Sequence, residues 1–243
     1  MPKWRIGILC FRDHKGSQAL IAAVKGKAIR RKVLWGIEPS SDLPQVYEAS
    51  IYGNSTGIVA RCTWGGPQAA ILVEELAEMR VEFLIGYGAV GSIDSDLLQG
   101  TQVIVSKALP TDGTSSHYVG VAVGPDRTLS ALCPDVPEVT AATIDAVYRE
   151  TPSLIRAWKA KGAQVVNMEV TPFYAAAIKC GVKALWLGHV SDVLVGNWKH
   201  WYVDRTQMNV RTIANCVSVI AGIKRKKISR PASSRGRDAD PGG

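Results

Sequence analysis

Two acidic residues follow strand-like apolar stretches and are placed to act on one substrate. Glu169 comes shortly after Val165 and Val166, and Asp192 follows the apolar stretch 183–190. A helix between them predicts a right-handed β-α-β unit, in which both strands end on the same side of the sheet. Paired carboxylates suit glycosidic chemistry, because one can hold the sugar while the other protonates the leaving group. The alternative for Glu169 is that it only accepts N–H bonds from its own helix.

A charged turn near the start of the chain is a possible anion site. Arg12, His14 and Lys15 follow the first predicted strand, and a guanidinium with two further basic groups can hold an anion. Charge on a solvated loop is the alternative. Farther along, Gly65 and Gly66 precede a helix, and such glycines let backbone amides approach a ligand closely.

Apolar periodicity and turn residues predict the elements that position these groups. An antiparallel meander at the sheet edge is followed by alternating strands and helices, which predicts an α/β fold with a mixed sheet covered on both faces. Thr171 and Pro172 are typical of a helix N-cap and first turn. The predicted strands are 5–10, 33–37, 46–51, 57–61, 102–108, 141–148, 165–168 and 183–190. Residues 82–92 are predicted to run as an apolar strand into a glycine-dense turn. The predicted helices are 18–24, 68–80, 151–161, 172–180 and 204–223.

Composition favours one domain over residues 1–223. The 243 residues are 47% hydrophobic, enough for a sizeable core. No apolar run is long enough to span a bilayer, and five scattered cysteines indicate reduced thiols, so we expect a cytoplasmic protein without membrane contact.

Charge is concentrated at the end of the chain. The net charge is +8, but residues 224–243 hold seven basic and two acidic side chains, which leaves the domain near +3. We therefore expect no specific nucleic-acid binding by the domain. The basic tail, 224–243, is predicted to be a disordered appendage, with a weak polyanion contact as the alternative.

Six motifs, in this order and spacing, resemble those of the nucleoside phosphorylase and nucleosidase superfamily, which includes purine nucleoside phosphorylases, uridine phosphorylases and methylthioadenosine nucleosidase. The resemblance covers about residues 1–223. It implies a three-layer α/β/α fold with a central mixed β-sheet, a small-molecule nucleoside as substrate, and a homo-oligomer (a dimer or a trimer of dimers). It implies no cofactor and no metal, with phosphate as a possible co-substrate. The motifs are Thr63-Trp64-Gly65-Gly66-Pro67, Gly88-Ala89-Val90-Gly91-Ser92, Asp112-Gly113-Thr114-Ser115-Ser116-His117-Tyr118, Thr143-Ile144-Asp145-Ala146-Val147-Tyr148, Met168-Glu169 and Ser191-Asp192.

The resemblance implies a role for each matching residue. Glu169 would hydrogen-bond the ribose hydroxyls, with Met168 under the sugar. Asp192 would protonate or hydrogen-bond N7 of the departing base, and because the uridine branch lacks the Ser-Asp pair, this favours a purine. A purine leaves more easily as a neutral base, so Asp192 would have to hold a proton at neutral pH. The other substrate-binding positions implied are Asn167, Ala89, Val90, Gly91, Val147, Tyr148 and Ser191.

The phosphate positions depart from the family pattern. Phosphorylases use an arginine just before the Gly-x-x-Gly turn and a hydroxyl within it, and these positions are Gly86 and Ala89 here. Arg12, His14 and Lys15 would have to supply a substitute anion site. The nucleosidases' water-activating glutamate corresponds to Lys15, so hydrolysis loses its usual base too. Trp198, Trp201 and Tyr202, after Asp192, would pack under the closing helix or form a lid.

We therefore predict an enzyme that cleaves the N-glycosidic bond of a purine-type nucleoside, with phosphorolysis and hydrolysis as rivals. The alternative is a catalytically weakened nucleoside-binding module, favoured by the loss of both familiar nucleophile systems.

Overall fold

The computed structural model describes residues 1–39, 42–62, 65–194 and 206–223. The basic tail, 224–243, lies outside these residues, as do Trp198, Trp201 and Tyr202.

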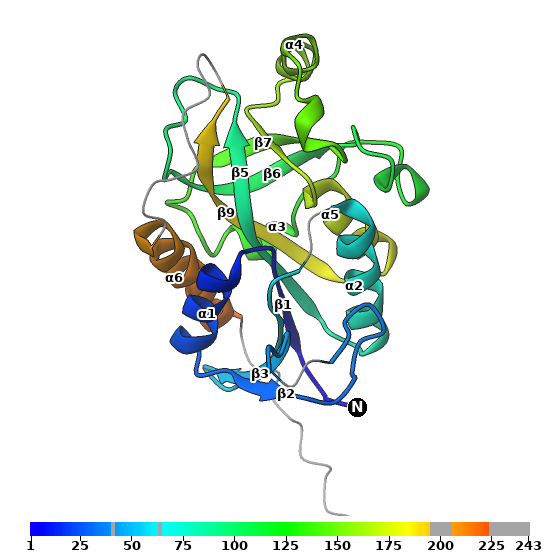
Figure 1. The fold of residues 1–243 in the computed structure, drawn as a ribbon, viewed down its shortest axis with the longest axis vertical. Coiled ribbons are helices and arrows are strands. Elements are labelled where there is room, and N and C mark those ends of the chain that lie inside the picture. Colours follow the sequence, from blue (N-terminus) through cyan, green and yellow to red (C-terminus); the bar gives the residue numbers. More distant parts are fainter. Residues whose placement is uncertain (40–41, 63–64, 195–205, 224–243) are drawn as a thin grey trace, which may run out of the picture.

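A nine-stranded mixed sheet forms the centre of the molecule (Figure 1). Its order is β2-β3-β4-β1-β5-β8-β7-β6-β9, and β5 also pairs with β9, so five of the strands close into a ring. The strands are β1 (Ile6–Cys10), β2 (Lys27–Ile29), β3 (Val46–Ile51), β4 (Asn54–Val59), β5 (Phe83–Ser92), β6 (Gln102–Leu109), β7 (Glu138–Thr143), β8 (Val165–Asn167) and β9 (Lys183–Val193). The helices are α1 (His14–Ala23), α2 (Gly66–Glu78), α3 (Arg127–Ser130), α4 (Pro152–Ala160), α5 (Val170–Lys179) and α6 (Thr206–Gly222), with short 3-10 helices η1 (Ser115–His117) and η2 (Val147–Arg149).

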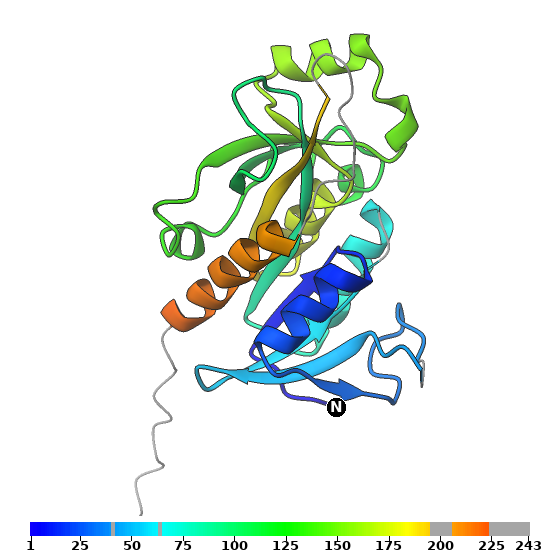
Figure 2. The ribbon, with the colours of Figure 1, turned by 60° about the vertical axis from the view of Figure 1, so that its left-hand side comes forward.

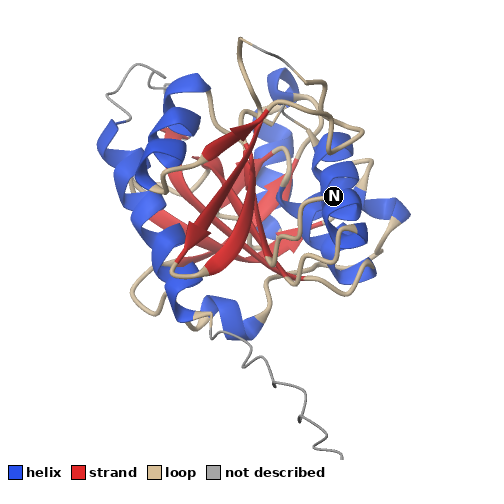
Figure 3. Cartoon of the chain, turned by 90° about the horizontal axis from the view of Figure 1, so that it is seen from below, coloured by secondary structure: helices blue, strands red, loops and turns tan. Residues whose placement is uncertain are grey.

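Helices cover both faces of the sheet. Helices α2 and α5 lie side by side on one face, and α1 and α6 lie side by side on the other (Figures 1 and 2). Strand β1 shows why two layers form: Leu9 packs in the core under α2 and α5, whereas Ile6 and Ile8 pack in the core under α1 and α6. Seen from below, the strands lie between helices (Figure 3). The predicted α/β/α architecture is confirmed.

The edge of the sheet is an antiparallel meander, as predicted, but its first strand is not at 33–37. Strand β2 takes that place and pairs with β3. Leu34 and Ile37 are buried nonetheless, and Leu34 packs in the same core as Leu72 of α2. Their apolar character therefore reflects burial of a turn under a helix, not pairing in a sheet.

The prediction that 82–92 ends in a glycine-dense turn is also wrong, because β5 continues as a strand to Ser92. Gly86 and Gly88 face the ring of Trp186 on β9. A Cβ atom would lie 2.3 Å from a ring atom at position 86 and 2.4 Å at position 88. These glycines make room for an indole across a strand pair and do not bend the chain.

No helix in the described parts of the chain combines the length and apolar character that crossing a bilayer requires.

Candidate active site

The junction between β8 and α5 is organised by Asn167. Its Oδ1 accepts the backbone N–H groups of Glu169 and Val170, the latter at 2.7 Å. These two bonds close an Asx turn that leads into α5, whose N-cap residue is Glu169. The prediction that Thr171 caps this helix is wrong, because α5 begins earlier and the Thr171 hydroxyl instead donates to the carbonyl oxygen of Leu109 at 2.9 Å.

The carboxylate of Glu169 is buried and held by two donors from outside its helix. Oε1 accepts the N–H of Gly65 at 3.0 Å, and Oε2 accepts Nδ2 of Asn167 at 2.8 Å. Burial raises the pKa of Glu169 to about 7, although both hydrogen bonds act in the opposite direction. Glu169 makes no capping bond to its own helix, which is evidence against the alternative interpretation. The sequence suggested that backbone amides at Gly65 and Gly66 approach a ligand. The N–H of Gly65 donates to Glu169 instead.

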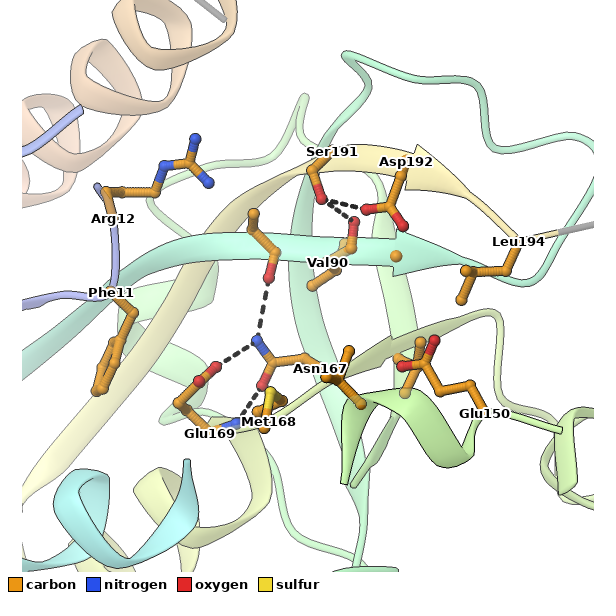
Figure 4. A pocket seen from close by; sticks show the side chains of 14 residues that line it. Phe11, Arg12, Val90, Glu150, Asn167, Met168, Glu169, Ser191, Asp192 and Leu194 are labelled. Carbon is orange, nitrogen blue, oxygen red and sulfur yellow. Dashed lines mark hydrogen bonds between the residues drawn. The ribbon is translucent and has the colours of Figure 1, made fainter. Parts of the chain in front are cut away.

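Glu169 and Asp192 line one cavity of about 140 Å³ that is open to solvent (Figure 4). Its other lining residues include most of the predicted substrate positions, namely Ala89, Val90, Gly91, Val147, Asn167, Met168 and Ser191, together with Arg12. Phe11, Glu150, Val166 and Leu194 complete the lining. The structure thus brings together residues from β5, β8 and β9, from the segments that follow β1, β8 and β9, and from the turn after β7.

The two acids meet by a different topology from the one predicted. Strand β8 is antiparallel to β5, whereas β9 is parallel to it, so β8 and β9 do not form a parallel β-α-β unit. Strand β8 pairs with only the last two residues of β5. Asn167, at its carboxyl end, lies between Glu169 and Glu150 along the cavity (Figure 4). There the Nδ2 of Asn167 donates a hydrogen bond to the Ala89 carbonyl oxygen at 3.0 Å.

Asp192 lies at the opposite end of the cavity from Phe11 and Arg12 (Figure 4). The hydroxyl of Ser191 lies within hydrogen-bonding distance of Asp192 Oδ1 and of the Val90 carbonyl oxygen, the latter at 3.3 Å. The register between β5 and β9 shifts between Val90 and Gly91. Such an irregularity re-aims side chains at the end of a strand.

Tyr148 is not part of the cavity lining, and its side chain is 93% exposed. The predicted strand 141–148 ends at Thr143, and Val147 to Arg149 form a 3-10 helix. Side chains three residues apart share one face of such a helix. Val147 and Glu150 therefore both face the cavity, while Tyr148 points elsewhere.

The proposed anion site is reduced to Arg12. This side chain is 6% exposed and lines the cavity. His14 and Lys15 are exposed in the first turn of α1 and do not line it. The reason is that α1 begins four residues earlier than predicted, since the carboxylate of Asp13 accepts the N–H of Gly16 at 2.8 Å and caps the helix there.

The structure also shows what lies at positions 86 and 89, which lack the arginine and the hydroxyl that the family resemblance leads one to expect. The Trp186 ring fills the space that a side chain at position 86 would need. Trp186 in turn stacks on Phe11, with ring centroids 5.2 Å apart, and Phe11 lines the cavity. Ala89 lines the cavity too but offers no hydroxyl.

Sequence reasoning missed Glu150, the third acid of the cavity. Burial raises the pKa of Glu150 to about 7, and the negative charge of Asp192 adds to this effect. Its position three residues after Val147 was the signal that could have revealed it. That signal has meaning only if 147–149 form a 3-10 helix, whereas the sequence predicted a strand over 141–148.

Comparison with known proteins identifies the family. The sequence profile of the phosphorylase superfamily matches residues 44–220. An uncharacterised protein, R802, of Acanthamoeba polyphaga mimivirus is 32% identical over 176 residues, which cover 69% of this chain and 70% of that protein. A guanosine phosphorylase of Halorubrum lacusprofundi is 31% identical over 156 residues, covering 60% of this chain and 62% of that protein.

Solved structures agree on the fold. AMP nucleosidase from Bacteroides thetaiotaomicron superposes with a TM-score of 0.66 at 14% identity, covering 88% of this chain and 87% of the other. The profile match spans most of the chain and includes both β5 and the β8–α5 junction that build the cavity. The resemblance inferred from the motifs is therefore confirmed, and the chain belongs to the phosphorylase superfamily.

Proposed function

We propose that this protein cleaves the N-glycosidic bond of a purine-type nucleoside. The observation that carries the proposal is the single cavity lined by Glu169, Asp192 and Arg12, with acids at both ends. A carboxylate is a strong acceptor for the vicinal hydroxyls of ribose, and a protonated carboxyl is a donor to a ring nitrogen. This is the set of groups that glycosidic cleavage requires.

In the proposed reaction, Glu169 holds the sugar above Met168. The bond between C1′ and the base nitrogen breaks, and its electron pair goes to the base. Asp192 gives a proton to N7, so the base departs neutral, and the positive charge that develops on the sugar is relieved by attack of a nucleophile at C1′. The buried carboxylate of Glu169 lies at the sugar end of the cavity, where it also stabilises that charge.

Arg12 favours phosphate as the nucleophile. It is a buried guanidinium at the same end of the cavity as Phe11 and Glu169 (Figure 4). A guanidinium binds phosphate oxygens through paired N–H donors. Arg12 would therefore replace the arginine for which Trp186 leaves no space at position 86.

A second candidate is a nucleoside-binding module without efficient turnover. It is favoured by Ala89, which lines the cavity where the family places a phosphate-binding hydroxyl, and by the Trp186 ring at the other phosphate position. Each lost charged contact removes roughly 1.5–3 kcal/mol of phosphate binding.

The deciding experiment incubates the full chain with a panel of purine and pyrimidine nucleosides, with and without phosphate. We expect free purine and ribose 1-phosphate, formed only when phosphate is present. Release of ribose without phosphate would instead support hydrolysis. Measurable binding of nucleosides with no base released from any of them would support the binding module.

Arg12→Ala, with His14→Ala as the matched control, tests the phosphate site. Both remove a basic side chain near the start of α1, but only Arg12 lines the cavity. We expect Arg12→Ala to raise the KM for phosphate by roughly 10-fold or more, and His14→Ala to leave it unchanged. Equal effects of the two variants would contradict the assignment.

A further inference from the structure

Arg12 carries the proposed phosphate site, but it belongs to no helix or strand. It lies in the connection between β1, which ends at Cys10, and α1, which begins at His14. The direction of its guanidinium group therefore depends on the residues that fix its backbone and flank its side chain.

The buried hydroxyl of Ser17, in the first turn of α1, fixes the backbone of Arg12. Its Oγ donates to the Arg12 carbonyl oxygen at 3.2 Å, accepts the N–H of Arg61 at 3.1 Å, and lies 3.3 Å from Cys10 Sγ. A hydroxyl has one hydrogen to donate and two lone pairs with which to accept. With the Cys10 thiol as donor, these three bonds use that whole capacity. Ser17 thus ties the segments that follow β1 and β4 to α1.

Arg61 makes this junction rigid. Its φ is 52°, in the left-handed region that favours glycine, so its backbone conformation costs free energy. Its Nη2 atom donates to the carbonyl oxygens of Leu43, at 2.6 Å, and Pro44, at 2.9 Å. Strain of this kind persists only where several contacts hold it in place. The bond to Ser17 is therefore part of a network that has one arrangement.

Gly16, next to Ser17, leaves room for the Arg12 side chain. A Cβ atom at position 16 would lie 2.9 Å from Arg12 Cβ and 3.3 Å from Arg12 Nε. Separations this short require a neighbour to move. Gly16 does not have a positive φ, so its backbone conformation does not require glycine, but the close approach of Arg12 does.

Neither Ser17 nor Gly16 is among the described residues that line the cavity, so they reach a ligand there through Arg12. A guanidinium group binds a phosphate through paired N–H donors, whose planar geometry tolerates little displacement. A misplacement of about 1 Å in a positioned group can cost roughly 100-fold in function. Support of this kind around Arg12 is what a pre-organised anion site needs.

We propose that Ser17 and Gly16 are positioning residues of the phosphate site: the Ser17 hydroxyl fixes the backbone of Arg12, and Gly16 leaves the space that the Arg12 side chain occupies. The inference rests on the proposed function for the role of Arg12. It concerns two residues outside the motifs by which the family was identified.

The test measures the binding of inorganic phosphate to the full chain by calorimetry, together with the KM for phosphate and for the nucleoside where cleavage occurs. Ser17→Ala removes the hydroxyl, and Gly16→Ala adds a Cβ atom against Arg12. Thr56→Val is the matched control for Ser17, because the buried Thr56 hydroxyl also donates to a main-chain carbonyl oxygen, at 3.2 Å, and does not line the cavity. Gly120→Ala is the control for Gly16, since nothing lies within 4 Å of a Cβ atom there.

We expect Ser17→Ala and Gly16→Ala each to raise the Kd for phosphate by roughly 5-fold or more, and both controls to stay within about 2-fold of the wild-type protein. The KM for the nucleoside should change by less than about 2-fold in all four variants. Added to Arg12→Ala, Ser17→Ala should have no further effect on the Kd, because a residue that acts through Arg12 loses its influence once the guanidinium group is gone. If Ser17→Ala fails to fold, Ser17→Cys decides the question, since it fills a similar space with a weaker donor.

Unchanged phosphate binding in Ser17→Ala or Gly16→Ala, alongside weaker binding in Arg12→Ala, would overturn the inference for that residue and leave the proposed function standing. A further loss when Ser17→Ala is added to Arg12→Ala, or an equal rise in the KM for the nucleoside, would also overturn it, because either result indicates general damage to the fold.

The expected pattern of phosphate binding without cleavage of any nucleoside would contradict the proposed function alone. Absence of phosphate binding to the wild-type protein, or unchanged binding in Arg12→Ala, would overturn both the phosphate site and this inference.

Discussion

Asn167 does three things with one side chain. Its oxygen accepts two N–H groups at the start of α5, while its nitrogen donates to Glu169 and to the Ala89 carbonyl oxygen. An acid at this position would accept the same N–H groups but could not donate to Glu169, so asparagine turns a repulsive neighbour into a hydrogen-bond donor.

Substitutions at Asn167 should separate its structural from its electrostatic role. Asn167→Ala removes the Asx turn before α5 and should lower the free energy of unfolding by about 1–2 kcal/mol in chemical denaturation. Asn167→Asp keeps an acceptor oxygen for this turn and should lose less stability, yet weaken nucleoside binding by roughly 10-fold because a second carboxylate faces Glu169. Equal loss of stability in the two variants would show that the turn is unimportant.

Asp192→Asn tests the acid role at the base end. Asparagine preserves the size of the side chain and can donate a hydrogen bond, but it has no proton to transfer. We expect purine release to fall by roughly 100-fold or more with an unchanged circular dichroism spectrum, in line with the contribution of a positioned general acid. Unchanged rates would remove Asp192 from that role.

At the scale of elements, the pairing of β5 with β9 depends on small residues beneath Trp186. Gly88→Ala would place a Cβ atom 2.4 Å from the indole ring, and overpacking of this kind costs typically about 1–3 kcal/mol. Gly120→Ala is the matched control, because nothing lies within 4 Å of a Cβ atom there. Thermal denaturation should show a lower Tm for Gly88→Ala only, and a similar Tm for both would mean that the strands adjust without cost.

The sequence predicted the elements whose signals are local and missed those that depend on neighbours. Helix α2 and strands β3 and β6 follow from apolar periodicity and lie close to their predicted bounds. The strand character of 86–92 did not show, because glycine usually marks a turn and the reason for it here, Trp186, is about a hundred residues away.

The candidate site was predictable to the same degree. Glu169 and Asp192 were found from their places after apolar stretches, although the antiparallel course of β8 was not. Glu150 was missed and Tyr148 wrongly included for one reason: a 3-10 helix changes which side chains share a face, and nothing local distinguishes it from the end of a strand.

For the whole molecule, the buried acids make stability depend on pH. The pKa of Glu169 is raised from 4.5 to about 7, so the native state holds this proton more tightly than the unfolded state does. The free energy of unfolding should therefore be largest at low pH as far as this group is concerned, fall as the pH rises from about 4.5 to 7, and level off above. The fall is at most about 3 kcal/mol for Glu169.

Urea denaturation at pH 5, 6, 7 and 8 measures this slope. Glu169→Gln should flatten it over this range, whatever its effect on absolute stability, and Glu150→Gln should flatten it less because Glu150 is only partly buried. A wild-type stability that rises from pH 5 to pH 7 would contradict the role of burial in setting these pKa values.

Trp186 also limits how this protein can be altered. Its ring occupies the space of a side chain at position 86, so an arginine cannot be restored there by one substitution without overfilling the core. Reducing Trp186 first would leave Phe11 without its stacking partner and open a void behind the cavity. Each single substitution on the way to an arginine at position 86 therefore passes through a less stable protein. Gaining or losing that arginine requires positions 86 and 186 to change together.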